Sequence, residues 1–312
     1  MNAAIKGRMQ WEKKGLIFGP SGESSWARNS ALQPTPYLNK KLNLIRVFVG
    51  LRDDEGVSRV GFVDVAADDP SRVLKVSQTP ALDVGRPGAF DENGVVPCAA
   101  VERDGKLFLF YAGYQLGRKV KFFVFSGLAI SEDGGESFQR YSQVPVCDRT
   151  DDEVFFRVIH TMMFDEGKWK AWYGGGSEFD VDNGHQYPRY NIRYAESPDG
   201  IHLNEEFEIC IDMTAGEYRV GRPYVIKRDG RYCMFYGAGT KEAGYRLAYA
   251  ESADGHNWTR KDSELGIAVS EAGWDSRMQA YPAIVSTGAQ TYMFYNGNDY
   301  GREGFGYAVL KD

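Results

Sequence analysis

The sequence is poor in the features that mark membrane proteins, metal fingers and nucleotide-binding loops. It has four cysteines and four histidines in 312 residues, and no Cys/His pair has the spacing of a zinc site. No glycine-rich phosphate loop stands between a strand and a helix. Apolar runs fall far short of the ~20 residues of a membrane helix, and the opening MNAAIKGRMQWEKKG lacks the apolar core of a secretory signal. We therefore expect a cytoplasmic protein with no membrane partner.

The cysteine content and the net charge further limit the kinds of protein that this chain can be. Cys98 and Cys233 lie inside apolar runs, and the four cysteines show no paired spacing, which favours buried thiols over disulfides. The net charge of −6 at pH 7 argues against a nucleic-acid partner, because such binding depends on basic surface. No cofactor motif is present, so we expect no cofactor.

A short aromatic segment recurs along the chain at a spacing of roughly 60 residues. The copies are LIRVFVGLR at 44–52, KLFLFYAGY at 106–114, KWKAWYGGG at 168–176, RYCMFYGAG at 231–239 and QTYMFYNGN at 290–298. Four tyrosines and one valine mark the same place in each copy: Val49, Tyr111, Tyr173, Tyr236 and Tyr295. A fixed period of this order predicts stacked or radial repeats with the marker residues packed in the core.

Each repeat has the same internal order. An apolar run follows a proline or arginine, then come a tight turn such as Arg228-Asp229-Gly230, the aromatic segment and a third run such as RLAYAES at 246–252. Three repeats add Ser-x-Asp-Gly turns that lead to a fourth, outer run. The alternation of apolar and polar residues is typical of strands, and no helix is predicted. Four antiparallel strands in each of five repeats predict an all-β, five-bladed β-propeller.

The two ends of the chain are expected to meet. The fifth repeat stops after its third strand, at Asp312, and residues 10–18 have the strand character to supply the missing outer strand. Pairing of these segments would close the ring and protect an open edge; the alternative is a flexible N-terminal arm. A propeller divides its core between blades, so residues 1–312 are predicted to form a single domain despite exceeding the ~250 residues of a usual single core.

The Phe-Tyr-x-Gly segments and Ser-x-Asp-Gly-x-x-Trp turns resemble those of the five-bladed arabinanase, levansucrase and invertase superfamily of glycoside hydrolases. The stretches 273–278 and 295–308 look like those of a bacterial branch that is described as glycosidase-like and is associated with surface-polysaccharide gene sets. The resemblance covers almost the whole chain. It implies a funnel on the propeller axis, lined by the start of each first strand, in which the site would lie.

The resemblance places the candidate site residues at the first strands and the loops beside them. Glycoside hydrolysis needs two carboxyl groups, one that donates a proton and one that activates water or attacks the sugar. Repeats two to five each offer an acid, so the candidate catalytic residues are Asp91, Glu153, Glu217 and Asp275. We expect Asp91 to be a base or orienting carboxylate, Glu153 the general acid, and one of the others the remaining carboxylate. The candidate substrate-binding residues are Asn29, Arg52, Asp53, Asn93, Arg157, Arg219, Arg222, Arg277, Tyr281 and Asn298.

Two features bear on whether the chain hydrolyses glycosides. Superfamily members usually carry an aspartate base on the first strand of the first repeat, whereas residues 24–33 contain no acid. Arginines gather at the predicted first strands, and a guanidinium recognises a carboxylate or phosphate through two hydrogen bonds. They predict an anionic sugar or a sugar phosphate as the ligand; alternatively, they pair with the acids in a structural network.

His160 lies within a predicted first strand, where superfamily members sometimes place a histidine near an axial cation. A core histidine is expected instead, and no metal site. The functions that stay open are a glycosidase-like hydrolase acting on a glycan or activated sugar, and a non-catalytic carbohydrate-binding or accessory protein of bacterial polysaccharide biosynthesis. A protein-interaction propeller is a third alternative, although its repeat signature differs.

Overall fold

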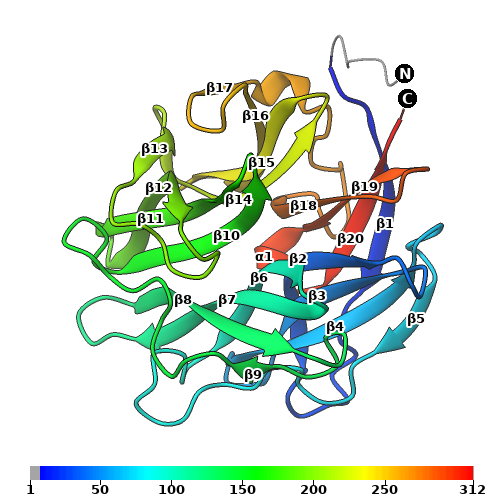
Figure 1. The fold of residues 1–312 in the computed structure, drawn as a ribbon, viewed down its shortest axis with the longest axis horizontal. Helices are drawn as coiled ribbons and strands as arrows, with labels where there is room; N and C mark the ends of the chain where they lie inside the picture. Colours follow the sequence, from blue (N-terminus) through cyan, green and yellow to red (C-terminus); the bar gives the residue numbers. More distant parts are fainter. Residues whose placement is uncertain (1–7, 312) are drawn as a thin grey trace.

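The computed structural model describes residues 8–311, and strands dominate it (Figure 1). Residues 1–7 and 312 of the predicted domain lie outside the described residues. The strands fall into five successive antiparallel groups. The first group comprises β2 (Asn29–Asn39), β3 (Leu44–Arg52), β4 (Ser58–Ala66) and β5 (Val73–Val76). The second comprises β6 (Val95–Arg103), β7 (Lys106–Leu116), β8 (Phe122–Ser131) and β9 (Gln139–Arg140).

The other three groups repeat this order. The third group comprises β10 (Phe156–Asp165), β11 (Lys168–Asp182), β12 (His185–Ser197) and β13 (Glu208–Ile211). The fourth comprises β14 (Glu217–Arg228), β15 (Arg231–Thr240), β16 (Gly244–Ser252) and β17 (Trp258–Arg260). The fifth comprises β18 (Ala280–Ser286), β19 (Thr291–Asn296), β20 (Phe305–Leu310) and the N-terminal strand β1 (Trp11–Phe18).

Strand β1 lies beside the last strand of the chain. It pairs antiparallel with β20, from Trp11 opposite Leu310 to Phe18 opposite Phe305. The segment predicted at residues 10–18 is therefore a strand, and β1 and β20, the first and last strands, lie side by side in Figure 1. A row of backbone N–H and C=O groups on β20 is paired in this way, and an unpaired row of this kind would recruit other chains.

Two short helical turns interrupt the strands, so the expectation of no helix is wrong in this detail. They are the 3₁₀ turn η1 (Asp262–Glu264) and the four-residue α1 (Asn298–Gly301). Asp299 and Tyr300 within α1 have φ of 52° and 59°, which are left-handed values. A turn this short and irregular has no 3.6-residue periodicity, so the sequence pattern does not predict it. Within residues 8–311, no helix is long and apolar enough to cross a membrane.

The first strands of the five groups contact one another in a circle. β2 contacts β6, β6 contacts β10, β10 contacts β14, β14 contacts β18, and β18 contacts β2. These strands surround the middle of the view in Figure 1, and the later strands of each group lie farther out. Residues near the start of each first strand are thereby brought together from segments far apart in the sequence.

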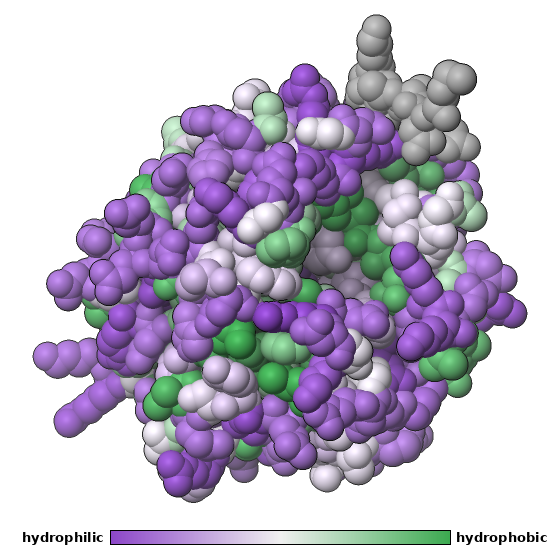
Figure 2. Space-filling view, in the orientation of Figure 1, coloured by the Kyte–Doolittle hydropathy of each residue, from purple (hydrophilic) through white to green (hydrophobic). Residues whose placement is uncertain are grey.

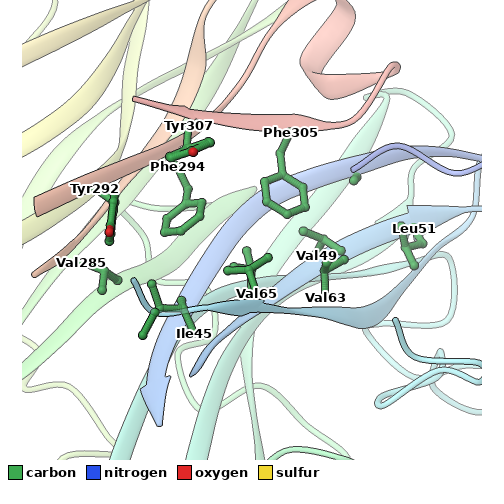
Figure 3. Close-up of a cluster of buried hydrophobic side chains, with 13 residues drawn as sticks. Ile45, Val49, Leu51, Val63, Val65, Val285, Tyr292, Phe294, Phe305 and Tyr307 are labelled. Atoms are coloured by element: carbon green, nitrogen blue, oxygen red, sulfur yellow. The ribbon is translucent and has the colours of Figure 1, made fainter. Parts of the chain in front are cut away.

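The hydrophobic core is divided between neighbouring groups. Separate clusters of buried side chains join the first group to the second, the second to the third, the third to the fourth and the fourth to the fifth. Another joins the fifth group back to the first: Val49 and Val63 face Phe294 and Phe305 across the gap between the sheets (Figure 3). Burial of apolar surface between sheets is the main stabilising contribution in such an arrangement.

The repeat markers are core residues, as predicted. Val49, Tyr111, Tyr173, Tyr236 and Tyr295 are all 0% exposed. The four cysteines are free thiols, and Cys98, Cys147 and Cys233 are buried, which confirms the expectation of buried thiols over disulfides.

Candidate functional site

Each first strand breaks its pairing register, and five of these breaks, one from each group, bring side chains together. They fall at Gln33-Pro34, Cys98, His160, Arg222-Pro223 and Tyr281-Pro282; β2 and β14 each have a second break nearer their start. Three of these residues, Gln33, Arg222 and Tyr281, have φ of 50°, 60° and 59°, a region that non-glycine residues rarely adopt. Bulges of this kind redirect side chains and are common beside binding sites. We refer to Gln33, Cys98, His160, Arg222 and Tyr281 as the hub cluster.

Arg222 of the hub cluster connects the fourth strand group to the first. It is 2% exposed, and its Nη2 donates to the carbonyl oxygen of Pro34 over 3.1 Å and to Oγ1 of Thr35 over 3.0 Å. Its Nε and Nη1, and Nδ1 of His160, have no hydrogen-bond partner among residues 8–311. Burial lowers the pKa of Arg222 because the charged form loses hydration. Burial, followed by the charge of Arg222, holds the pKa of His160 well below 6.5, so this ring is neutral at pH 7.

Arg219 lies three residues earlier on β14 and is surrounded by phenol rings. The distances from its guanidinium carbon to the ring centres are 4.2 Å for Tyr245, 4.7 Å for Tyr218, 5.4 Å for Tyr300 and 6.0 Å for Tyr190. Each contact of this type contributes about 0.5–1 kcal/mol when exposed and about 2 kcal/mol when desolvated. We refer to Arg219 and these four tyrosines as the arginine–tyrosine cluster.

The two clusters meet at Tyr281. Its ring centre is 5.8 Å from that of Tyr245 and 6.4 Å from that of Tyr300. The hydroxyls of Tyr190 and Tyr245 share a hydrogen bond, and the ring of Tyr190 stacks on Phe156 at 4.3 Å. Tyr281 and Tyr300 are half-buried, so the aromatic surface reaches solvent.

The positive charge of Arg219 has no carboxylate beside it. Arg219 is 7% exposed; its Nη2 donates to the hydroxyl of Tyr300 over 2.7 Å, and its Nε has no partner. Within residues 8–311, no Asp or Glu lies within ion-pair distance of Arg219 or Arg222. A buried charge is costly unless an opposite charge or several hydrogen bonds compensate it. This pair of arginines is therefore suited to receive an anion.

The four candidate catalytic acids, by contrast, are each ion-paired within their own strand group. Asp91 accepts from Nε of Arg140 (2.8 Å), Glu153 lies 2.6 Å from Nε of Arg157 and 3.1 Å from Nη1 of Arg193, and Glu217 accepts from both Nη atoms of Arg260 (2.8 and 2.9 Å). Asp275 accepts from Nζ of Lys13 (2.7 Å). The basic side chains that pair with Asp91, Glu217 and Asp275 are Arg140, Arg260 and Lys13. Each lies on the strand at the outer edge of its group, which is β9, β17 and β1, respectively.

The marker tyrosines complete two of these pairs. Tyr111 donates from its hydroxyl to Asp91 and Tyr295 to Asp275, each over 3.0 Å. Burial is the largest influence and would raise the pKa of Glu217 and Asp275. The hydrogen bonds and charge of Arg260 and Lys13, together with hydrogen bonds from Thr214 to Glu217 and from Ser270 and Gln279 to Asp275, outweigh it and lower both pKa values. Both carboxylates are therefore ionised near neutral pH, and each is already hydrogen-bonded to a basic side chain. In Asp91, Oδ1 is buried and has no hydrogen-bond partner among the described residues.

With this geometry established, the relationship to known proteins can be stated. No protein-family model matches the chain. Uncharacterized protein Rv1502 of Mycobacterium tuberculosis (strain ATCC 25618 / H37Rv) is 34% identical over 305 residues, which cover 97% of this chain and 100% of that protein. Uncharacterized protein MT1551 of strain CDC 1551 / Oshkosh matches over the same length at the same identity. The chain belongs to the family of these mycobacterial proteins.

Solved structures share the fold of this family. A glycosyl hydrolase from Bacteroides ovatus superposes with a TM-score of 0.74 at 15% identity, covering 99% of this chain and 95% of that one. A thermostable family-43 glycoside hydrolase gives 0.68 at 15% identity, covering 92% and 91%. The endo-arabinase from Bacteroides thetaiotaomicron VPI-5482 gives 0.66 at 11% identity, covering 93% and 98%. The resemblance to arabinanase-type propellers is thus confirmed at the level of the fold, which does not by itself fix an activity.

The substrate-binding candidates divide into those that gather at the centre and those that do not. Arg219, Arg222 and Tyr281 come together in the two clusters. Arg157 is committed to Glu153 and to the carbonyl oxygen of Asp148. Arg277 lies on the surface, where its side chain is 70% exposed and forms a 2.9 Å ion pair with Asp299.

The remaining candidates serve turns of the backbone or lie beside them. The Asp53 carboxylate accepts from the backbone N–H of Val57 and from Arg59, Asn93 accepts from Leu116 N–H, and Asn298 accepts from Arg277 and Met278 N–H. The Asn29 side-chain amide donates weakly to the carbonyl oxygen of Asp53 over 3.4 Å. Arg52 is half-buried, and its Nε has no partner among the described residues. Their roles in binding stay predictions.

Sequence reasoning missed the tyrosines that surround Arg219. A signal was present: Tyr190 and Tyr245 occupy the same place in two third strands, YNIRYAES at 190–197 and YRLAYAES at 245–252. Tyr300 lies two residues after Asn298, one of the candidate substrate-binding residues. Among residues 8–311, no three His, Cys, Asp or Glu side chains gather to hold a metal ion. Beside His160, the charge of Arg222 helps to lower the pKa of the imidazole.

Proposed function

We propose that this protein is a glycosidase-like carbohydrate-binding protein whose ligand carries an anionic group, a carboxylate or a phosphate. The observation that carries the proposal is the buried guanidinium of Arg219, which is surrounded by phenol rings and has no acidic partner among residues 8–311. A guanidinium fork matches the geometry of a carboxylate or phosphate. The ligand would supply the charge that the protein does not.

Aromatic surface beside the cation suits a sugar ring. Tyr281 and Tyr300 are half-buried and lie next to Arg219, so their faces can contact the apolar C–H face of a pyranose while the anionic group reaches the guanidinium. Tyrosine combines an apolar ring with a hydroxyl that can bond to sugar hydroxyls. A sugar acid or a sugar phosphate would use both halves of this surface.

The architecture that we propose around this site is a single domain, a five-bladed ring closed by β1. Three observations support it: the circle of contacts made by the first strands, the pairing of β1 with β20, and the core cluster shared by the first and fifth groups. In such a ring the starts of the first strands line one funnel. Arg219 and the residues of the hub cluster would then lie on its wall.

Hydrolysis is the second candidate function, and Asp91 is the observation that favours it. One of its carboxylate oxygens has no partner among the described residues, so Asp91 retains an uncommitted oxygen despite its pairing with Arg140. In this alternative Asp91 activates water, Glu153 donates the proton, and Glu217 or Asp275 supplies the remaining carboxylate. The ion pairs of all four acids weigh against it, because a paired carboxylate is a poor proton donor.

Calorimetric titrations with matched ligands test the binding proposal. D-glucuronate and glucose 6-phosphate would be compared with methyl β-D-glucopyranoside on the wild type, Arg219→Met and Arg219→Lys. Loss of charge-assisted hydrogen bonds of about 1.5–3 kcal/mol corresponds to a roughly 10–150-fold weaker affinity for the anions in Arg219→Met. Arg219→Lys should fall between, and the neutral glycoside should change little.

Arg277→Met is the matched control, because Arg277 is an exposed arginine outside both clusters. Equal losses for charged and neutral ligands in Arg219→Met, or equal losses in the two variants, would contradict the proposal. A panel of aryl glycosides, tested with the wild type and Glu153→Gln, decides the second candidate. Turnover that disappears in Glu153→Gln would establish hydrolysis, and no turnover would leave the binding role.

A further inference from the structure

A cavity of about 290 Å³ lies between the fourth and fifth strand groups, apart from both clusters. Residues from β1, β14, β15, β16, β18, β19 and β20 line it. Figure 2 shows the face of the molecule hollowed in the region of β18 to β20, with hydrophobic side chains along the wall.

This cavity shares no lining residue with the arginine–tyrosine cluster. Tyr249 in its wall stands four residues after Tyr245, the ring nearest to Arg219, on the same strand, β16. At ~3.3 Å per residue of strand, the two sites are roughly 13 Å apart along β16. A single sugar ring at Arg219 does not span that distance, so this cavity is considered by itself.

Three aromatic rings form one side of the cavity. The ring of Trp11 meets Phe235 edge to face at 6.2 Å, and Phe235 lies 5.1 Å from Tyr249. Aliphatic residues, including Ile284 and Leu310, complete the apolar part of the wall. The indole Nε1 of Trp11 is buried and has no hydrogen-bond partner among residues 8–311, so an acceptor oxygen on a ligand would be its first partner.

The charges in the wall balance one another. Arg228, Arg231 and Lys261 face Asp229, Glu251 and Glu264, three bases against three acids. Lys261 lies 3.1 Å from Glu251, which also accepts from the hydroxyl of Tyr249 over 2.9 Å. A charged ligand therefore gains no net attraction here, whereas hydroxyl groups can both donate to and accept from such pairs.

We propose that this cavity binds one uncharged saccharide unit. A pyranose has an apolar C–H face, which fits the rings of Trp11, Phe235 and Tyr249, and a belt of hydroxyls, which fits the paired charges. Small-molecule sites usually enclose ~300–1,000 Å³, and this cavity is at the small end, which favours one ring over an oligomer. The site is independent of the anion proposed at Arg219 and takes a ligand of different charge.

Fluorine NMR of protein labelled with 5-fluorotryptophan tests the assignment. The chain has six tryptophans, and Trp11→Phe identifies the resonance of Trp11. Titration with methyl β-D-glucopyranoside and methyl β-D-galactopyranoside should shift that resonance saturably, with a dissociation constant in the millimolar range. Thr291→Phe, which places a ring at a half-buried position in the cavity wall, should weaken this binding at least tenfold.

Leu42→Phe adds the same ring at an exposed site outside the cavity and should leave the titration unchanged. D-glucuronate binding, measured by calorimetry, should survive in Thr291→Phe, which shows that the variant is folded. The proposal is overturned if neither glycoside moves the Trp11 resonance when the glycoside is at millimolar concentration and in up to 100-fold excess over the protein. It is also overturned if Thr291→Phe binds them normally, or if indole saturates the site and the glycosides do not.

Discussion

Nη2 of Arg219 donates a hydrogen bond of 2.7 Å to the hydroxyl of Tyr300. The two residues belong to different strand groups, since Arg219 is on β14 and Tyr300 is in α1 after β19. Tyr300 has a left-handed backbone, with φ of 59°, and such strain is retained where the surrounding structure requires it. The hydrogen bond thus fixes the guanidinium in place and holds the α1 turn over the site.

Tyr300→Phe tests this positioning role. The variant keeps the ring but removes the acceptor of Nη2, so the guanidinium loses its orientation. A single hydrogen bond contributes about 0.5–1.5 kcal/mol, so the affinity for D-glucuronate should fall roughly two- to twelvefold. Tyr141→Phe, at an exposed position, is the control. Unchanged affinity in Tyr300→Phe, measured by calorimetry, would show that Arg219 needs no such partner.

Tyr295→Phe and Tyr111→Phe test the repeated pairing of a marker tyrosine with a buried acid. Each variant removes a 3.0 Å hydrogen bond to Asp275 or Asp91 without changing the ring. A buried acceptor that loses one donor destabilises the fold by about 1–3 kcal/mol. Urea unfolding followed by circular dichroism should show a lower midpoint in both variants. If neither midpoint moves, the hydrogen bonds from the two tyrosine hydroxyls do not contribute to the stability of the fold.

Lys13→Met tests the contribution of β1 to the fifth group. Asp275 is 2% exposed, and its charge would lose the 2.7 Å partner that β1 provides. Because Lys13 is partly exposed, we expect a loss of about 2 kcal/mol, below the range for fully buried pairs. The measurement is the free energy of unfolding at pH 7, with Lys14→Met as the surface control.

The same pair predicts a dependence on acid. The folded pKa of Asp275 lies below 3.8, so its contribution to stability is present above that pH and is lost as the pH falls through the folded pKa. The decline below pH 4 should be shallower in Lys13→Met. A decline as steep as in the wild type would assign the acid sensitivity to other carboxylates.

His160→Gln is expected to flatten the pH dependence of stability between pH 7 and 5. The folded pKa of His160 is depressed, so the unfolded chain takes up a proton below about 6.5 that the folded chain does not, and stability falls with pH. The slope removed would be at most about 1.4 kcal/mol per pH unit. Of the groups around Arg222, burial raises the pKa of Cys98 to about 12 and that of Tyr281 well above its usual value, so neither titrates here. An unchanged slope would mean that His160 gains a proton in the folded state.

The repeat made the strands predictable, because each aromatic segment is a short run of aromatic and apolar residues between turn signals, and such a run forms a strand that is buried along most of its length. Val49 and Tyr295 could be placed in the core for that reason. The short α1 turn could not be predicted, since its left-handed residues leave no periodic pattern.

The site was predictable only in part. Arg219, Arg222 and Tyr281 could be identified because they lie at or near the start of the predicted first strands, and the contacts between these strands bring such positions together. The ion-pair partners of the candidate acids could not be predicted. Arg140, Arg260 and Lys13 belong to outer-edge strands, whose register depends on long-range packing. Tyr190 and Tyr245 resembled ordinary strand tyrosines until the fold placed them around Arg219.

A crystal structure with bound D-glucuronate tests the central claim most directly. The account predicts a carboxylate within hydrogen-bond distance of the Arg219 guanidinium and a sugar ring against Tyr281 or Tyr300. Density for the sugar at Asp91 and Glu153, or at the surface beside Arg277, with Arg219 untouched, would contradict it.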